Sequence, residues 1–475
     1  MIRILAAGVA VTLMAGAAQA QTPESGDAWR RLARADLDAA QALILENHPG
    51  AVAELGDDAF RRRLSEGYER ARERIAAVDG YVGYNAVLAG FATGFGDEHI
   101  WSTSRLRGVP YAWAGLVMTR RGGTWVVAAQ DGDDQGLVGA RLAACDGEPA
   151  EAVAAARLAF RVSAPVEAQF IAHGGFMFVD DGNPFLSRPR TCLFETGDGP
   201  VEVAMDWRPV ETPRLAAALN AAAGGKRAGF GVHRSGDAWW IAIERLSDEA
   251  ATVVETFEAQ APEWRDSPAL VIDLRGNGGG DSRYGRRLAD VIYGADHSAA
   301  RLRGGSACAA LWRASPGNAA HVRAFAARAQ DPQTARYYET LASDIDRAIA
   351  EGRPFDEPVP DCAPREPEAG PAPVYQGRVF IVTDHACFSS CLLMVRDFRT
   401  LGAVHVGEAT NVSTRYMEVR EIVLPSGLTN FSTLQKVVIG EDADIGPFTP
   451  AHVFPGSMAD TAALEAWIAG LLSKP

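Results

Sequence analysis

The sequence predicts an α/β protein in which helices cover both faces of a parallel sheet. Two apolar runs, ALVIDLR at 269–275 and RVFIVT at 378–383, are continuous rather than alternating. Continuous runs of this kind are typical of parallel strands that are buried on both faces. Segments with helical spacing alternate with these strands, as in other α/β folds. Two further parts precede this sheet, one helical and one rich in strands.

The first twenty residues have the pattern of a Sec-type signal peptide. Arg3 supplies a positive charge, an apolar run covers residues 4–18, and Ala18-Gln19-Ala20 fits a small-residue cleavage site. The alternative is a membrane anchor, but the run is short for a span of about 20 residues. We therefore expect a mature chain that starts near Gln21, is periplasmic or secreted, and has no stable membrane span.

The mature chain of about 455 residues is too long for one ordinary core and predicts several domains. Residues 28–95 carry apolar side chains at helical spacing, interrupted by a break at 47–50. Alternating strands and Gly/Asp turns then dominate 110–210. The expected parts are a signal peptide (1–20), an N-terminal helical region (21–105), a strand-rich module (106–228), and an α/β part (229–475) with a helical insertion (283–375).

Net charge and cysteine content limit the partners and the compartment. The formal charge is −14 and no basic run appears, so nucleic acid is not an expected partner. Six cysteines, an even number, indicate disulfides in an exported chain. A zinc site is less expected, because no second pair has metal-ligand spacing. The expected pairs are Cys308 with Cys362 and Cys145 with Cys192; pairing of Cys387 with Cys391 depends on local geometry.

A glycine-rich loop, GNGGGD at 276–281, ends the first buried strand. Glycines let the backbone turn sharply and expose N–H groups, which can hold an anion or an oxyanion. The run does not fit a dinucleotide fingerprint, because its sixth position is Asp281, and it lacks the Gly-Lys-Ser/Thr of a P-loop. A plain flexible loop is the alternative interpretation.

Ser389 is the candidate nucleophile, because it lies at a turn between the strand 378–383 and a helical segment. Such a turn exposes a hydroxyl at the carboxyl edge of the sheet and directs helix N-terminal N–H groups toward it. The Ser390 N–H, together with Gly278 or Gly279, is the candidate oxyanion site. The alternative interpretation of Ser389 is a helix N-cap.

Together these motifs resemble the tail-specific, or C-terminal processing, serine peptidase family. The resemblance rests on DLRGNGGG at 273–280, Phe388-Ser389-Ser390-Cys391, and Gly407-Glu408-Ala409-Thr410, although Leu392 replaces an acidic residue of the family. GFGDEHIW at 94–101 and a PDZ-like stretch at 135–153 extend it over roughly 28–460. The resemblance implies a crotonase-like ββα catalytic core, a PDZ-like module and peptidase activity.

The general base is expected to be a histidine. One branch of the family uses a lysine just after Gly-Glu-x-Thr, but this chain has no lysine from 227 to 435, and Lys436 lies too far along. The similarity is therefore to the tricorn-core-like branch, which uses Ser and His. His99 matches the position of that histidine, and a neutral imidazole is a suitable base near pH 7. His385, four residues before the candidate nucleophile, is the rival.

The same resemblance points to an acid that orients the base. Asp444 has the corresponding spacing from Pro450, with Asp442 and Glu441 as neighbouring alternatives. The family's Pro-Asp is Pro450-Ala451 here, and Glu98 stands where that branch has a serine. Solvated loop acids are the alternative interpretation of this cluster.

Two functions fit these residues. The first is an exported serine peptidase that acts on a peptide or protein substrate through an acyl-enzyme on Ser389, with no metal or organic cofactor. The second is a non-catalytic protein on the same core that binds peptides or apolar ligands, as the retinoid-binding relatives of this fold do. The departures at Glu98, Leu392 and Ala451 motivate the second. The presence of both Ser389 and His99 favours the enzyme.

Overall fold

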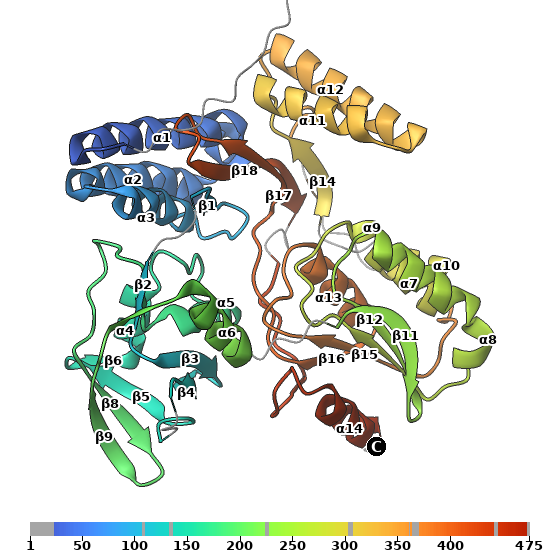
Figure 1. Cartoon of the computed structure of the whole chain (residues 1–475). Helices are drawn as coiled ribbons and strands as arrows, with labels where there is room; N and C mark the ends of the chain where they lie inside the picture. The colour runs from blue at the N-terminus through green and yellow to red at the C-terminus, as the bar shows by residue number, and fades with distance from the viewer. Residues whose placement is uncertain are drawn as a thin grey trace, which may run out of the picture.

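The computed structural model describes residues 23–106, 110–132, 136–223, 228–302, 307–360, 362, 370–440 and 445–472. These residues form fourteen α-helices and four β-sheets (Figure 1). Among the helices of these ranges, none combines the length and apolar character that a bilayer span requires. The helices and sheets together make the chain a mixed α/β protein, as predicted.

The central sheet is formed by strands from the C-terminal half of the chain. Its order is β11-β12-β13-β15-β16-β19. All neighbours from β12 to β19 are parallel, and only the edge strand β11 is antiparallel. The strands are β11 (Phe230–Ser235), β12 (Ala238–Ile243), β13 (Ala269–Asp273), β15 (Arg378–Thr383), β16 (Val404–Gly407) and β19 (His452–Val453).

Both faces of this sheet are buried, which explains the continuous apolar strands. Leu270 and Ile272 of β13 pack into one core together with α7, α9 and α13. Ala269 and Val271 of the same strand face a second core, which includes α14. The predicted parallel sheet with helices on both faces is confirmed. The helices of this part are α7 (Asp248–Ala259), α8 (Ala261–Trp264), α9 (Ser282–Tyr293), α10 (Ala295–Leu302), α13 (Ser390–Thr400) and α14 (Thr461–Leu472).

The N-terminal helices pack against a second sheet that comes mainly from the C-terminal half (Figure 1). Leu37 and Phe91 of the helices share one core with Phe431 and Val437 of β18. Three α-helices form here, α1 (Gly26–Asn47), α2 (Asp58–Arg74) and α3 (Tyr81–Thr93), with 3-10 turns at Pro49–Ala51, Ala53–Leu55 and Ile75–Ala77. The strands are β1 (Ser102–Ser104), β14 (Ala307–Trp312), β17 (Tyr416–Val423) and β18 (Thr429–Gly440).

One strand of this second sheet, β1, comes from a segment far away in the sequence. β1 is antiparallel to β18, with Ser102 opposite Phe431. β18 also pairs with β14 and β17. The loop between α3 and β1 is therefore held against the C-terminal half of the chain, and this position matters for the site.

The strand-rich module contains two sheets. The larger has the order β3-β4-β5-β8-β9 with β6 beside β5, and the smaller has the order β10-β2-β7. Cys145 and Cys192 are opposite each other on β5 and β8 and form a disulfide, which confirms that predicted pair. The elements are β2 (Tyr111–Trp113), β3 (Leu116–Arg121), β4 (Thr124–Gln130), β5 (Arg141–Cys145), β6 (Glu148–Pro149), β7 (Val179–Asp180), β8 (Thr191–Thr196), β9 (Gly199–Ala204), β10 (Arg208–Val210), α4 (Ala150–Arg157), α5 (Glu167–His173), a 3-10 turn (Gly174–Phe176) and α6 (Thr212–Ala223).

The predicted helical insertion is divided between two places. α9 and α10 lie against the central sheet, and β14 then joins the second sheet. The hairpin of α11 (Pro316–Arg328) and α12 (Pro332–Ala350) lies away from the central sheet, and its small core includes Trp312 of β14 (Figure 1). Cys362 is disulfide-bonded, but the predicted partner Cys308 has its side chain outside the described residues.

Candidate active site

Ser389 lies in the turn between β15 and α13, at the carboxyl edge of the central sheet. Its φ is 56°, a left-handed conformation that residues other than glycine rarely adopt. It occupies the N-cap position of α13, yet its side chain makes no capping hydrogen bond. The hydroxyl is thus not engaged in the role that the N-cap interpretation assigns to it, and the strained backbone presents it at the sheet edge.

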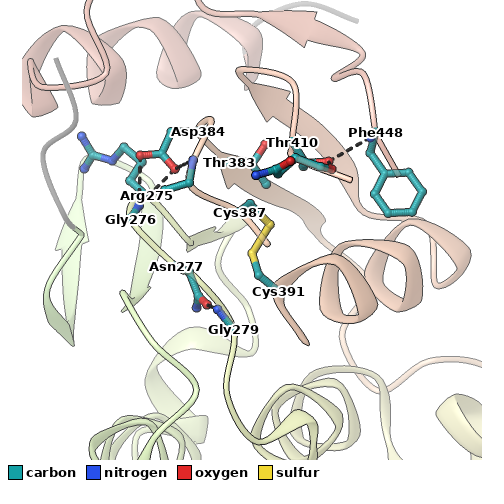
Figure 2. The surroundings of a disulfide bond; sticks show 12 residues. Arg275, Gly276, Asn277, Gly279, Thr383, Asp384, Cys387, Cys391, Thr410 and Phe448 are labelled. Atoms are coloured by element: carbon teal, nitrogen blue, oxygen red, sulfur yellow. Dashed lines mark hydrogen bonds between the residues drawn. A yellow bond between two sulfur atoms is a disulfide. The ribbon is translucent and has the colours of Figure 1, made fainter. Parts of the chain in front are cut away.

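A disulfide between Cys387 and Cys391 spans this turn (Figure 2). Both cysteines are fully buried in the core beneath the sheet. The Cys391 N–H also donates to the carbonyl oxygen of Phe388 at 3.1 Å. Cys387 and Cys391, whose pairing could not be decided from the sequence, therefore do form a disulfide. This bond links the two ends of the segment that carries Ser389.

The glycine-rich loop lies directly beside residues 384–389, the turn that carries the candidate nucleophile and is called the nucleophile turn below. The Gly276 N–H donates to both carboxylate oxygens of Asp384, at 3.1 and 3.0 Å (Figure 2). The Phe388 N–H donates to the carbonyl oxygen of Asn277 at 3.3 Å. A Cβ on Gly279 would lie only 2.8 Å from the Cβ of Ser389. The two segments thus come together at the ends of neighbouring strands, and Gly279 permits their close approach.

The three candidate oxyanion donors differ in how their N–H groups are used. The Gly279 N–H donates to the side-chain oxygen of Asn277 at 2.8 Å, so it is engaged within the loop (Figure 2). Gly278 is exposed, and Ser390 is the first residue of α13. Neither of these two N–H groups donates a hydrogen bond within the described part of the chain. Of the three candidates, Gly279 is thus the one whose N–H is engaged by a described residue.

His99 is held by a buried carboxylate that the sequence interpretation did not assign. Oδ1 of Asp97 is 2.9 Å from His99 Nδ1 and also accepts from the His99 backbone N–H at 2.8 Å. The Thr414 hydroxyl donates to the other carboxylate oxygen. Burial would raise the pKa of Asp97, but the hydrogen bonds from His99 and Thr414 outweigh it and hold this pKa below its usual value.

The charge on Asp97 determines which imidazole nitrogen is basic. An ionised carboxylate only accepts hydrogen bonds, so Nδ1 of His99 must carry the proton in the bond to Asp97. In the neutral ring, Nε2 then has a free lone pair. This is the tautomer that a general base requires.

The second sheet brings His99 to the nucleophile turn. The Ser432 hydroxyl on β18 donates to the His99 carbonyl oxygen at 2.8 Å. The His99 ring lies 4.3 Å from the ring of Phe388, centroid to centroid, and Phe388 immediately precedes Ser389. The predicted nucleophile segment, glycine loop and histidine therefore converge in space, although they are far apart in sequence.

The rival histidine, His385, has a different environment. Its Nδ1 is 3.3 Å from a carboxylate oxygen of Glu408. Burial alone would lower the pKa of His385, but Glu408 and the neighbouring Asp384 outweigh burial and raise it. The surroundings of His385 therefore stabilise its protonated form, whereas a general base must accept a proton.

The predicted orienting acid, Asp444, lies outside the described residues, as do its alternatives Glu441 and Asp442. Among the described residues, Asp97 is the acid in contact with His99. A sequence signal for it exists: an aspartate two residues before a histidine can accept the histidine N–H in a local Asx turn. This Asp-x-His spacing is present at residues 97–99.

Comparison with known proteins gives a match in structure but not in sequence. No family model matches the chain, and no curated protein matches it. The structure of mature CPAF is similar, with a TM-score of 0.58, 15% sequence identity, and coverage of 94% of this chain and 96% of that chain. A structure of mature CPAF complexed with lactacystin has a TM-score of 0.57, 15% identity, and coverage of 94% and 97%. At this identity, the likeness establishes a shared fold.

Proposed function

We propose that this chain is an exported serine-type peptidase of the C-terminal processing kind, with Ser389 as the nucleophile and His99 as the general base. One observation carries the proposal. A strained turn presents a serine hydroxyl that caps no helix, and the ring of a histidine bound to a buried aspartate packs against that turn. The sequence resemblance supports the same reaction, and we take the central sheet with its helices as the crotonase-like core that the resemblance implies.

The proposed reaction begins with attack by the Ser389 hydroxyl oxygen on a peptide carbonyl carbon. His99 Nε2 accepts the hydroxyl proton, and Asp97 stabilises the imidazolium that forms. The tetrahedral intermediate collapses, the C–N bond breaks, and His99 returns the proton to the leaving amine. Water then attacks the acyl-enzyme by the same route and releases the acid. Asp97 replaces Asp444 as the proposed orienting acid, because it contacts the imidazole directly.

The oxyanion is proposed to bind to two backbone N–H groups. Gly278 contributes one from the loop that follows β13, and Ser390 contributes the other from the start of α13, where the helix dipole also favours negative charge. Gly279 has a spatial role instead, because its N–H is bound to Asn277 and its missing side chain makes room for Ser389.

We propose that the protein works outside the cytoplasm on peptide or protein substrates. The signal-peptide pattern motivates export, and two disulfides at Cys145–Cys192 and Cys387–Cys391 suit an oxidising compartment. The PDZ-like module is proposed to bind a peptide end by β-augmentation at β3 or β9, the two edge strands of its larger sheet. If it does, amidation or extension of the substrate C-terminus changes KM; an unchanged KM contradicts the capture step.

A cleavage experiment tests the proposed function. The mature protein and its Ser389→Ala variant are each incubated with a proteome-derived peptide library, and new termini are identified by mass spectrometry. The proposal predicts cleavage that disappears in the variant. Equal patterns for the two proteins contradict it, and binding of an apolar ligand without any cleavage supports the non-catalytic alternative.

A further inference from the structure

Asn411 lies at a buried junction of three parts of the chain. Its residue is 5% exposed. Its backbone N–H donates to the carbonyl oxygen of Cys387, in the nucleophile turn, at 3.1 Å. Its side-chain nitrogen donates to the carboxylate of Glu98, in the loop that carries His99. Its side-chain oxygen accepts from Nε2 of Gln169, on α5 of the strand-rich module, at 3.2 Å.

The neighbouring groups determine the direction of each hydrogen bond. Gln169 is fully buried, and its side-chain oxygen accepts from the backbone N–H groups of Ser163 and Ala164, both at 2.9 Å. Its side-chain nitrogen must therefore face Asn411. The oxygen of Asn411 also accepts the Val412 N–H at 2.8 Å, so only its nitrogen is left for Glu98. A rotated amide at either residue would place donors against donors.

Glu98 links this junction to the proposed catalytic pair. It is the covalent neighbour of both Asp97 and His99. Its second carboxylate oxygen lies 3.4 Å from Nε2 of His173, at the end of α5. The loop with the base is thus held by Asn411 on one side and by α5 on the other, while the backbone of Asn411 holds the nucleophile turn.

We infer that Asn411 is a positioning residue that sets the base loop against the nucleophile turn, and that Gln169 fixes its amide from the strand-rich module. The inference rests on the proposed function. Asn411 touches no reacting atom in this role. Its effect is on the relative placement of His99 and Ser389, where a displacement of about 1 Å costs about 10²-fold in rate. Disturbing it therefore lowers the rate of the chemical step more than it weakens substrate binding.

Reversal of one hydrogen bond tests this inference. Asn411→Asp places a new carboxylate against that of Glu98, and we expect the maximal rate of fluorophosphonate labelling to fall about tenfold or more, with little change in reagent affinity. Glu98→Gln combined with Asn411→Asp restores a donor and an acceptor in the opposite direction. We expect this double variant to recover most of the rate, to within about threefold of the wild type.

Asn183→Asp is the matched control. Asn183 is a buried amide of the strand-rich module whose side-chain oxygen accepts the Phe185 N–H, away from the junction. The same chemical change there is expected to leave the labelling rate unchanged. A wild-type rate for Asn411→Asp, or a double variant no faster than the single one, overturns the inference. Absence of labelling on folded wild-type protein is a separate result, because it overturns the proposed function itself.

Discussion

Replacing Gly279 with alanine is expected to lower the reactivity of Ser389 while the protein still folds. A Cβ on Gly279 would lie 2.8 Å from the Cβ of Ser389 and 2.9 Å from both the Phe388 carbonyl oxygen and the Ser390 nitrogen. Atoms that belong to or are anchored on the main chain cannot give way as a flexible side chain can. The nucleophile turn itself must therefore move, by several tenths of an ångström, to reach van der Waals contact.

The size of the effect follows from two contributions. Gly279 has a φ of 99°, and a residue with a side chain pays about 1–3 kcal/mol for such a conformation. The free energy of unfolding is expected to fall by that amount. The displacement of the nucleophile has a larger effect on reactivity: a shift approaching 1 Å costs about 10²-fold. We therefore expect the labelling rate of Ser389 to fall about 10- to 100-fold.

The neighbouring Gly278 is the matched control for this substitution. A Cβ there meets nothing within 4 Å, and alanine keeps the N–H that is proposed to bind the oxyanion. Gly278→Ala should label within about twofold of the wild type. The assay is the rate constant for fluorophosphonate labelling, with urea denaturation of each variant alongside. Wild-type labelling by a folded Gly279→Ala protein would refute the close approach of the loop to the nucleophile turn.

Three further predictions concern other parts of the site and the fold. Asp97→Asn removes the charge that stabilises the imidazolium, and we expect kcat to fall about 10²-fold or more; an unchanged kcat would exclude Asp97 as the orienting acid. Removing the turn disulfide with Cys387→Ala and Cys391→Ala should lower the free energy of unfolding by about 2 kcal/mol and slow the labelling of Ser389. Removing the Cys145–Cys192 disulfide instead should leave the labelling rate unchanged. Burial lowers the pKa of His405 to about 4. Between about pH 4 and about pH 6.5, His405 is therefore less protonated in the folded state than in the unfolded state. Urea denaturation should therefore show a loss of about 2–3 kcal/mol as pH falls through this window, and His405→Gln should reduce the loss; equal pH profiles would contradict this reasoning.

The parts of the fold that were predicted depend on local pattern. Strands 269–273 and 378–383 are apolar on both faces because helices cover both faces, and this burial is visible in the sequence. The encounter of the glycine loop with Ser389 was also predictable. Both segments follow neighbouring parallel strands, and the carboxyl ends of such strands lie at one edge of a sheet.

The parts that could not be predicted depend on distant pairing and on backbone detail. The approach of His99 to the nucleophile turn requires β1 to pair with β18, more than three hundred residues away in the chain, and no local pattern specifies that register. The engagement of the Gly279 N–H by Asn277 is likewise a matter of loop conformation. The contact between Asp97 and His99, by contrast, could have been predicted from the sequence, because the two residues form a short local turn.

The most direct test of the central claim is fluorophosphonate labelling of the protein, mapped by mass spectrometry, with Ser389→Ala and His99→Ala alongside. The proposed site predicts that the label is attached to Ser389 in the wild type and is lost in both variants. Labelling that is equal in the wild type and Ser389→Ala, or no labelling of a folded wild-type protein, would contradict Ser389 as the nucleophile.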